Sequence, residues 1–226
     1  MKFYQLGLGP LATVLKPFAY IVFFILYTSC AHKQVEIVTP SQAYDDEKYQ
    51  PVLVKWSRNS NVYKDLELRF KITAVLVAPE MEEAYRNRID YIYGQFAKID
   101  DKILLKKDTI AVILDFFGKP DSHYELSDES VWKMTMKIKD SVIPASEIHP
   151  YKRKEGLKPF FPLSSYWSRH YIVLFKIPNE VLNGLEVKDI FQTEKKANTE
   201  LPTDQENLIT FSMNSGEAQI KFSWDY

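Results

Sequence analysis

The sequence predicts a mainly β protein: an immunoglobulin-like antiparallel β-sandwich with one inserted amphipathic helix. Three observations predict this class. Several short segments alternate apolar and polar residues, as half-buried strands do. Most of these segments are separated by short turns, and one longer stretch repeats its apolar residues every three or four positions, as a helix does. The alternative is an α+β fold in which a single antiparallel sheet carries the helix on one face.

Length and charge limit the possible functions. The chain has 226 residues, 46% of them hydrophobic, which is enough apolar material for one sizeable core. Its 29 Lys and Arg residues are balanced by 30 Asp and Glu residues. Because no basic excess is present to neutralise a phosphate backbone, we expect no nucleic-acid partner.

The N-terminal residues have the pattern of a secretory signal. Residues 1–29 contain no acid, and Lys2 and Lys16 precede an apolar run from Pro17 to Tyr27. A basic region followed by an apolar region and small residues is typical of a signal peptide. The apolar run is short for a hydrocarbon core of about 30 Å, so an uncleaved membrane anchor is the second choice.

Cys30 is the only cysteine of the chain and directly follows this signal. It has no partner for an internal disulfide, and burial in the core is the remaining structural interpretation. Residues 1–30 resemble the signal peptide of bacterial lipoproteins, in which a small residue, here Ser29, precedes the lipidated cysteine. The resemblance implies cleavage before Cys30 and attachment of acyl chains such as palmitate, and two or more chains give stable anchoring. Ala31, in place of the aspartate that favours inner-membrane retention in some bacteria, implies the outer membrane, facing the periplasm.

We expect three parts: a signal peptide over 1–29, a flexible tether over 30–50 and a single domain over 51–226. The tether is polar and has neither helical nor strand periodicity. Its acidic cluster, residues 45–47, lacks the ligand spacing and turn glycine of a calcium loop. No metal is therefore expected there.

The first half of the domain alternates between the two periodicities. Strict alternation predicts a strand over 66–76. A helix is expected over 79–99, because Pro79 and several glutamates occupy its first turn and an apolar stripe follows. Alternation then returns over 110–116 and over 132–139, which predicts two further strands.

The second half ends in a predicted hairpin. Residues 170–177 are apolar on both faces, which indicates a central strand. Residues 185–191 are a weaker strand candidate. The alternating segments 209–213 and 218–224 flank a tight turn containing Gly216, which is typical of a β-hairpin.

The sequence lacks the signatures of common enzymes. The glycines are scattered, and the chain contains no phosphate-binding loop, no G-x-S-x-G and no H-E-x-x-H motif. The histidines are isolated from one another, so we expect no metal site and no cofactor. A hydrolase that uses the neighbouring Glu147 and His149 as acid and base is the least favoured function.

The connection from Ile143 to Trp167 is unusually long and combines prolines, basic residues and aromatics. Phe160 and Phe161 could plug one end of the sandwich. Alternatively, the connection is a docking loop with aromatic anchors and a basic rim. The candidate docking residues are Lys152, Arg153, Lys154, Phe160, Phe161, Tyr166 and Trp167.

These features predict a non-catalytic, membrane-anchored envelope lipoprotein that binds another envelope protein as an adaptor, scaffold or assembly factor. The strand alternation and the loop aromatics are similar to those of uncharacterised lipoproteins of predatory and related Gram-negative bacteria. The alternative function is a ligand-binding lipoprotein that holds a small apolar or saccharide ligand between its strands and the long connection.

Overall fold

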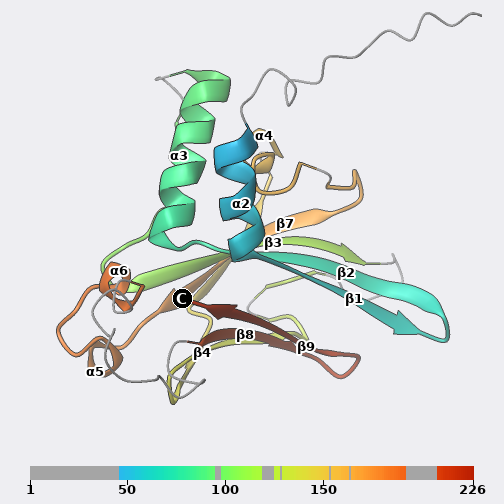
Figure 1. The fold of residues 1–226 in the computed structure, drawn as a ribbon. Helices are drawn as coiled ribbons and strands as arrows, with labels where there is room; N and C mark the ends of the chain where they lie inside the picture. The colour runs from blue at the N-terminus through green and yellow to red at the C-terminus, as the bar shows by residue number, and fades with distance from the viewer. Residues whose placement is uncertain are drawn as a thin grey trace, which may run out of the picture. The chain divides into compact units, whose positions relative to one another are not determined.

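Two antiparallel β-sheets form the centre of the fold, with a pair of helices on one side (Figure 1). The predicted mainly β class, with an inserted helix, is confirmed. The computed structural model describes residues 46–94, 98–118, 125–127, 129–152, 154–162, 164–191 and 208–226. The expected signal peptide, Cys30 and the tether up to residue 45 lie outside the described residues.

The larger sheet has five strands and the smaller sheet has four. In the larger sheet the spatial order is β1 (Ser57–Lys64), β2 (Glu67–Leu76), β3 (Thr109–Gly118), β7 (Arg169–Lys176) and β6 (Glu147–Tyr151). In the smaller sheet the order is β5 (Ser141–Pro144), β4 (Lys133–Ile138), β8 (Leu208–Asn214) and β9 (Gln219–Asp225). The predicted C-terminal hairpin is the β8–β9 pair.

The two main helices, α2 (Asp46–Trp56) and α3 (Pro79–Tyr93), lie on the side of the larger sheet that faces away from the smaller one (Figure 1). As predicted, α3 begins at Pro79. It ends at Tyr93 rather than at residue 99, because Gly94 has a φ of 78°, which a continuing helix does not allow. Three single-turn helices complete the described elements: α4 (Lys154–Leu157), α5 (Asn179–Leu182) and α6 (Val187–Ile190).

The central strands β3 and β7 of the larger sheet are buried on both faces. On the face toward the smaller sheet, the ring centroids of Phe175 on β7 and Phe211 on β8 are 5.8 Å apart. On the opposite face, Val75, Ile113 and Ile172 are cross-strand neighbours, and all three are fully buried. Two-sided burial explains why β3 and β7 have long apolar runs. The prediction that residues 170–177 form a central strand is confirmed, because β7 lies between β3 and β6.

Several elements were missed or misassigned because their sequences lack a clear period. β1 is a polar edge strand, and β6 is an edge strand that tolerates Pro150, so neither needs strong alternation. The connection 143–167 is therefore not one loop, since it contains the end of β5, all of β6 and α4. The strand prediction for 185–191 is wrong, because α6 forms there.

The helix α2 begins inside the segment expected to be a flexible tether. Its first residue is Asp46, and the side chains of Tyr49 and Leu53 are buried in the core. The sequence did not reveal this helix, because Pro51 and the exposed charged residues of the segment interrupt the apolar stripe that indicates a helix. The folded domain therefore starts before residue 51.

The first and last described elements are joined by hydrogen bonds. The Trp224 indole Nε1 donates to the Trp56 carbonyl oxygen at 2.8 Å. Arg58 donates to the Ser223 carbonyl oxygen at 2.8 Å and to the Lys55 carbonyl oxygen at 2.8 Å. These contacts connect the end of α2 and the start of β1 to the last strand of the smaller sheet.

Replacing Trp224 with Phe removes the indole donor and leaves a buried carbonyl oxygen without its partner. We expect Trp224→Phe to lower the free energy of unfolding by about 1–3 kcal/mol in urea denaturation. Trp167→Phe is the matched control, because that indole is on the surface, and its effect should stay within about 0.5 kcal/mol. Equal effects of the two substitutions would contradict the role of the Trp224 hydrogen bond.

Glu80 contributes to stability in a pH-dependent way. The Lys55 ammonium, 2.7 Å from the Glu80 carboxylate, lowers the pKa of Glu80, and the Trp56 indole adds to this effect while burial opposes it. Because the folded-state pKa lies below the ordinary value of 4.5, this stabilisation is present above that value and is lost as the pH falls through the folded-state pKa.

We expect Glu80→Gln to lower the free energy of unfolding at pH 7 by a few tenths of a kcal/mol, since about half of the side chain is in solvent. The difference from the unmodified protein should shrink as the pH falls below 4.5 and disappear once the carboxyl group is protonated in the folded protein. This difference in the free energy of unfolding is measured by urea denaturation at several pH values. Glu83→Gln is the control, because Glu83 is exposed. A difference that is independent of pH would contradict the ionic origin of the effect.

Candidate docking site

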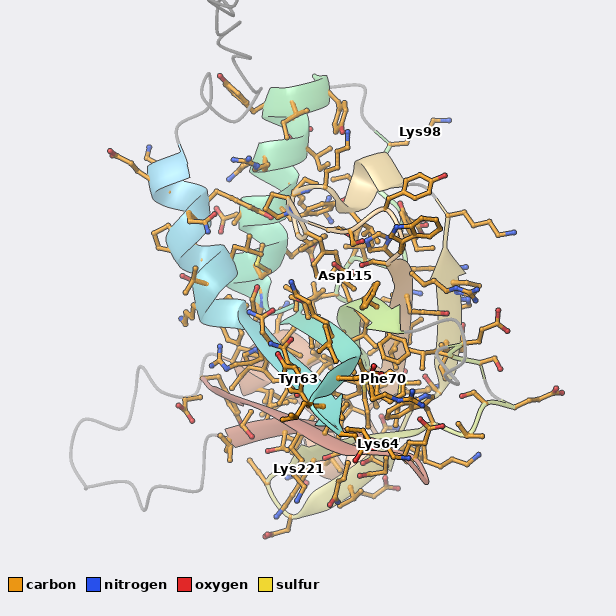
Figure 2. The ribbon with its side chains drawn as sticks, turned by 90° about the vertical axis from the view of Figure 1, so that its right-hand side faces the viewer. Tyr63, Lys64, Phe70, Lys98, Asp115 and Lys221 are labelled. Atoms are coloured by element: carbon orange, nitrogen blue, oxygen red, sulfur yellow. The ribbon has the colours of Figure 1, made fainter. Side chains whose placement is uncertain are left out.

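A row of polar residues crosses the larger sheet. Asn59, Thr73, Asp115, His170 and Tyr151 are successive cross-strand partners on β1, β2, β3, β7 and β6. We call these five residues the polar row. Directly paired residues point to the same face of a sheet. Asp115 lies on the side of the helices, whereas Phe70 lies on the side of the smaller sheet (Figure 2).

The centre of the polar row is buried. The side chain of His170 is 6% exposed and that of Asp115 is 13% exposed. His170 Nε2 lies 3.0 Å from Ser164 Oγ and 3.8 Å from Asp115 Oδ1. Phe161 stacks on the imidazole with ring centroids 5.6 Å apart. The segment between α4 and β7 therefore closes over this part of the sheet.

Asp115, His170 and Ser164 are the residue types of a catalytic triad, but their geometry differs from one. In a triad the acid and the serine approach opposite nitrogens of the imidazole, so that one holds the ring while the other nitrogen accepts the serine proton. Here both oxygens lie beside Nε2. They compete for the same ring position, which suits a structural hydrogen-bond cluster rather than activation of a nucleophile.

A pocket of about 220 Å³ lies beside this cluster. Thr73 and Asp115 line it from the sheet, and Ser165 and Ser168 line it from the segment before β7. Asp115 Oδ1 is buried and has no hydrogen-bond partner among the described residues. We call this cavity the Asp115 pocket. It is smaller than cavities that enclose drug-sized ligands, and its size suits one side chain or a small amine.

The structure places Phe160 and Phe161 in the core, where they are 2% and 5% exposed. Phe160 stacks on Tyr85 of α3, with ring centroids 4.4 Å apart. The Tyr85 hydroxyl donates to the Gly156 carbonyl oxygen at 2.9 Å, and burial raises the pKa of Tyr85 well above its usual range. The two phenylalanines fill the plug position and do not belong to a docking surface.

Tyr166 and Trp167, in contrast, are 80% and 73% exposed. Their rings meet edge to face with centroids 5.4 Å apart, and we call them the aromatic pair. A tight turn holds them: the Trp167 N–H donates to Ser165 Oγ at 3.2 Å, and the Ser168 N–H donates to the Ser165 carbonyl oxygen at 3.1 Å. Ser165 and Ser168 also line the Asp115 pocket, so the aromatic pair lies directly beside it.

The remaining candidate residues lie elsewhere or are not described. Lys152 is exposed, Arg153 lies outside the described residues, and nothing is described of the Lys154 side chain. Glu147 and His149 form a surface pair on β6, with Oε2 and Nε2 2.6 Å apart. Both groups are therefore accounted for by a hydrogen bond between them on an edge strand.

Sequence reasoning missed the polar row and its pocket. Asp115 and His170 were visible as polar positions in two predicted strands, but their proximity depends on the register between β3 and β7. Strand register is fixed by long-range pairing, so no local pattern reveals it. The only available signal was an acid inside an otherwise apolar run, 110–116.

Within the described part of the chain, no group of three or more His, Cys, Asp or Glu residues could hold a metal ion. No helix among those residues is long and apolar enough to cross a membrane. Comparisons with protein-family models, with curated proteins and with solved structures find no match to this chain. The site is therefore interpreted from its own geometry.

The different burial of the aromatic residues predicts different costs of removing them. Phe160→Ala should lower the free energy of unfolding by about 3–5 kcal/mol, because it opens a cavity between α3 and the sheet. Trp167→Ala should change it by less than about 0.5 kcal/mol. Urea unfolding of both variants tests this difference, and a comparable loss in Trp167→Ala would show that the aromatic pair is part of the core.

Proposed function

We propose that this protein is a membrane-tethered envelope lipoprotein that binds another protein through the aromatic pair and the Asp115 pocket. One observation carries the proposal: Tyr166 and Trp167 are exposed side by side on a hydrogen-bonded turn, next to a carboxylate that has one buried oxygen. The proposed role is that of an adaptor, scaffold or assembly factor.

The aromatic pair has the properties of interface anchors. Trp and Tyr dominate the binding energy of many protein interfaces because each buries a large area with few rotatable bonds. The turn at Ser165–Ser168 already fixes their backbone. Less conformational entropy is therefore lost on binding than for a flexible loop.

The Asp115 pocket favours a partner that presents a cationic side chain. A buried carboxylate oxygen without a hydrogen bond is costly, and a lysine or arginine of the partner would supply the missing donor. The hydroxyl groups of Thr73, Ser165 and Ser168 can accept its other hydrogen bonds. Lys71 also lines the pocket but is exposed, so it can turn into solvent when a partner binds.

A small-ligand function is less well supported than a protein-binding function. Leu157, Phe160 and Phe161 are packed into the core and fill the space beneath their part of the 143–167 connection. The Asp115 pocket beside Ser165 stays open but is smaller than cavities that enclose drug-sized ligands. The membrane-anchored part of the proposal rests on the resemblance of residues 1–30 to a lipoprotein signal peptide.

The lipid anchor is tested by Cys30→Ala in cells. We expect the unmodified protein to fractionate with membranes and its mature N-terminus to carry acyl chains in mass spectrometry. The variant should lose the acyl chains and leave the membrane fraction. A variant that remains membrane-bound at full length would instead indicate an uncleaved anchor.

The docking site is tested by crosslinking in the native envelope, followed by purification of the tagged full chain. We expect Tyr166→Ala and Trp167→Ala each to reduce the recovered partner about tenfold or more, as loss of an interface anchor does. Asp115→Asn should weaken recovery as well. Tyr63→Ala is the matched control, because Tyr63 is an exposed aromatic residue on β1.

Unchanged recovery with both aromatic-pair variants would contradict this docking site. Equal loss with Tyr63→Ala would also contradict it, since the effect would then not be specific to the turn beside the Asp115 pocket. Unfolding measurements on each variant show whether the domain remains folded.

A further inference from the structure

The helices α2 and α3 run antiparallel. At one end, Lys55 and Trp56 of α2 contact the Glu80 carboxylate of α3, at 2.7 Å and 3.1 Å. Toward the other end, the guanidinium group of Arg88 on α3 lies 4.7 Å from the ring centroid of Tyr49 on α2. The beginning of α2 therefore lies beside the last turns of α3, at the end remote from the sheets (Figure 1).

The last turn of α3 presents three large side chains to solvent. Tyr91, Ile92 and Tyr93 are 59%, 39% and 45% exposed, and they are the final residues of the helix. The residues with which α3 joins the core, including Met81, Tyr85 and Ile89, lie earlier in the helix. The core accordingly leaves much of this apolar and aromatic surface uncovered. We call this region, with the first turn of α2, the helix-pair end.

The composition of the helix-pair end fits the interface of a lipid bilayer. Tyrosine is enriched at the level of lipid headgroups because its ring is apolar and its hydroxyl group is polar. Exposed charges here have both signs: Lys48 is accompanied by Glu47 and Asp90. Attraction to anionic lipid is therefore small, and burial of the aromatic and apolar side chains is the dominant contribution.

The length of chain before α2 limits the distance between this end and the proposed anchor. Residues 31–45 connect Cys30 to Asp46, the first residue of α2. Fifteen residues span at most about 50 Å, whatever their conformation. The bilayer is thus present at a high effective concentration, and even a weak contact with it is populated.

We propose that the helix-pair end lies against the bilayer surface, with Tyr91, Ile92 and Tyr93 in the interfacial layer. This inference rests on the proposed lipid attachment at Cys30. In this orientation α3, with 15 residues, holds the sheets about 20 Å from the membrane. The lipid then retains the domain at the membrane, and the helix pair sets the orientation of the domain.

The test uses the mature, lipidated full chain in phosphatidylcholine vesicles. Because Cys30 is the only native cysteine and is acylated in the proposal, an added cysteine is the single reactive thiol. Ile92→Cys, labelled with an environment-sensitive fluorophore, reports on the helix-pair end. Leu66→Cys, at a β1–β2 turn position that is 98% exposed, is the matched control.

We expect the probe at residue 92 to shift its emission to the blue and to be quenched by lipids that carry a spin label near the headgroup. The probe at residue 66 should show neither effect. Adding Tyr91→Ser and Tyr93→Ser to Ile92→Cys should reduce the lipid quenching toward the value at residue 66. When a fifth of the lipid is anionic, the quenching at residue 92 and its loss in the triple variant should both be unchanged.

Absence of lipid quenching at residue 92 overturns the inference. A blue shift without lipid quenching also overturns it, because the helix-pair end would then be covered by protein, either a second copy or residues 31–45. The intact mass of the protein, measured before labelling, shows whether Cys30 carries acyl chains. It therefore separates a failed membrane contact from a failure of the proposed lipid anchor. An unacylated Cys30 overturns both the proposed lipid anchor and the membrane contact of the helix-pair end. An acylated Cys30 with an unquenched probe overturns the membrane contact alone.

Discussion

The burial of the central strands of the larger sheet on both faces is the constraint on which the rest of the fold depends. β3 and β7 can be apolar throughout because the smaller sheet covers one side and the helices with the Phe160–Phe161 plug cover the other. The helix α3 and the plug precede β3 and β7 directly in the chain, whereas the smaller sheet joins β4 and β5 to the C-terminal hairpin. The Trp224 and Arg58 hydrogen bonds show how the chain closes this arrangement, since they connect the first helix to the last strand.

The polar row follows from the same constraint. Because His170 is buried, its ring nitrogen needs a polar partner, and Ser164 supplies one while Phe161 stacks on the ring. The covering segment ends there, and Asp115 Oδ1 is left without a hydrogen bond at the edge of the plug. The pocket is thus located where the second covering layer stops, and the turn that ends this layer exposes Tyr166 and Trp167.

The described domain therefore has two exposed aromatic regions with different surroundings. The aromatic pair adjoins a polar pocket with a buried carboxylate, which suits a protein partner with a complementary cation. The helix-pair end exposes Tyr91, Ile92 and Tyr93 and is close in sequence to the proposed anchor. The proposed lipid contact and the proposed protein contact therefore use different parts of the domain.

The sequence by itself determined the mainly β class, the strands of the core, the start of α3 and the C-terminal hairpin, because each has a strong local period. It did not reveal β1, β6 or α6, whose short or edge positions need little apolar alternation. It identified the 143–167 segment as unusual but could not separate Phe160 from Trp167, since burial depends on what packs against a residue. The register that joins Asp115 to His170, and with it the pocket, was decided only by the tertiary structure, because strand pairing is set by contacts between residues far apart in the chain.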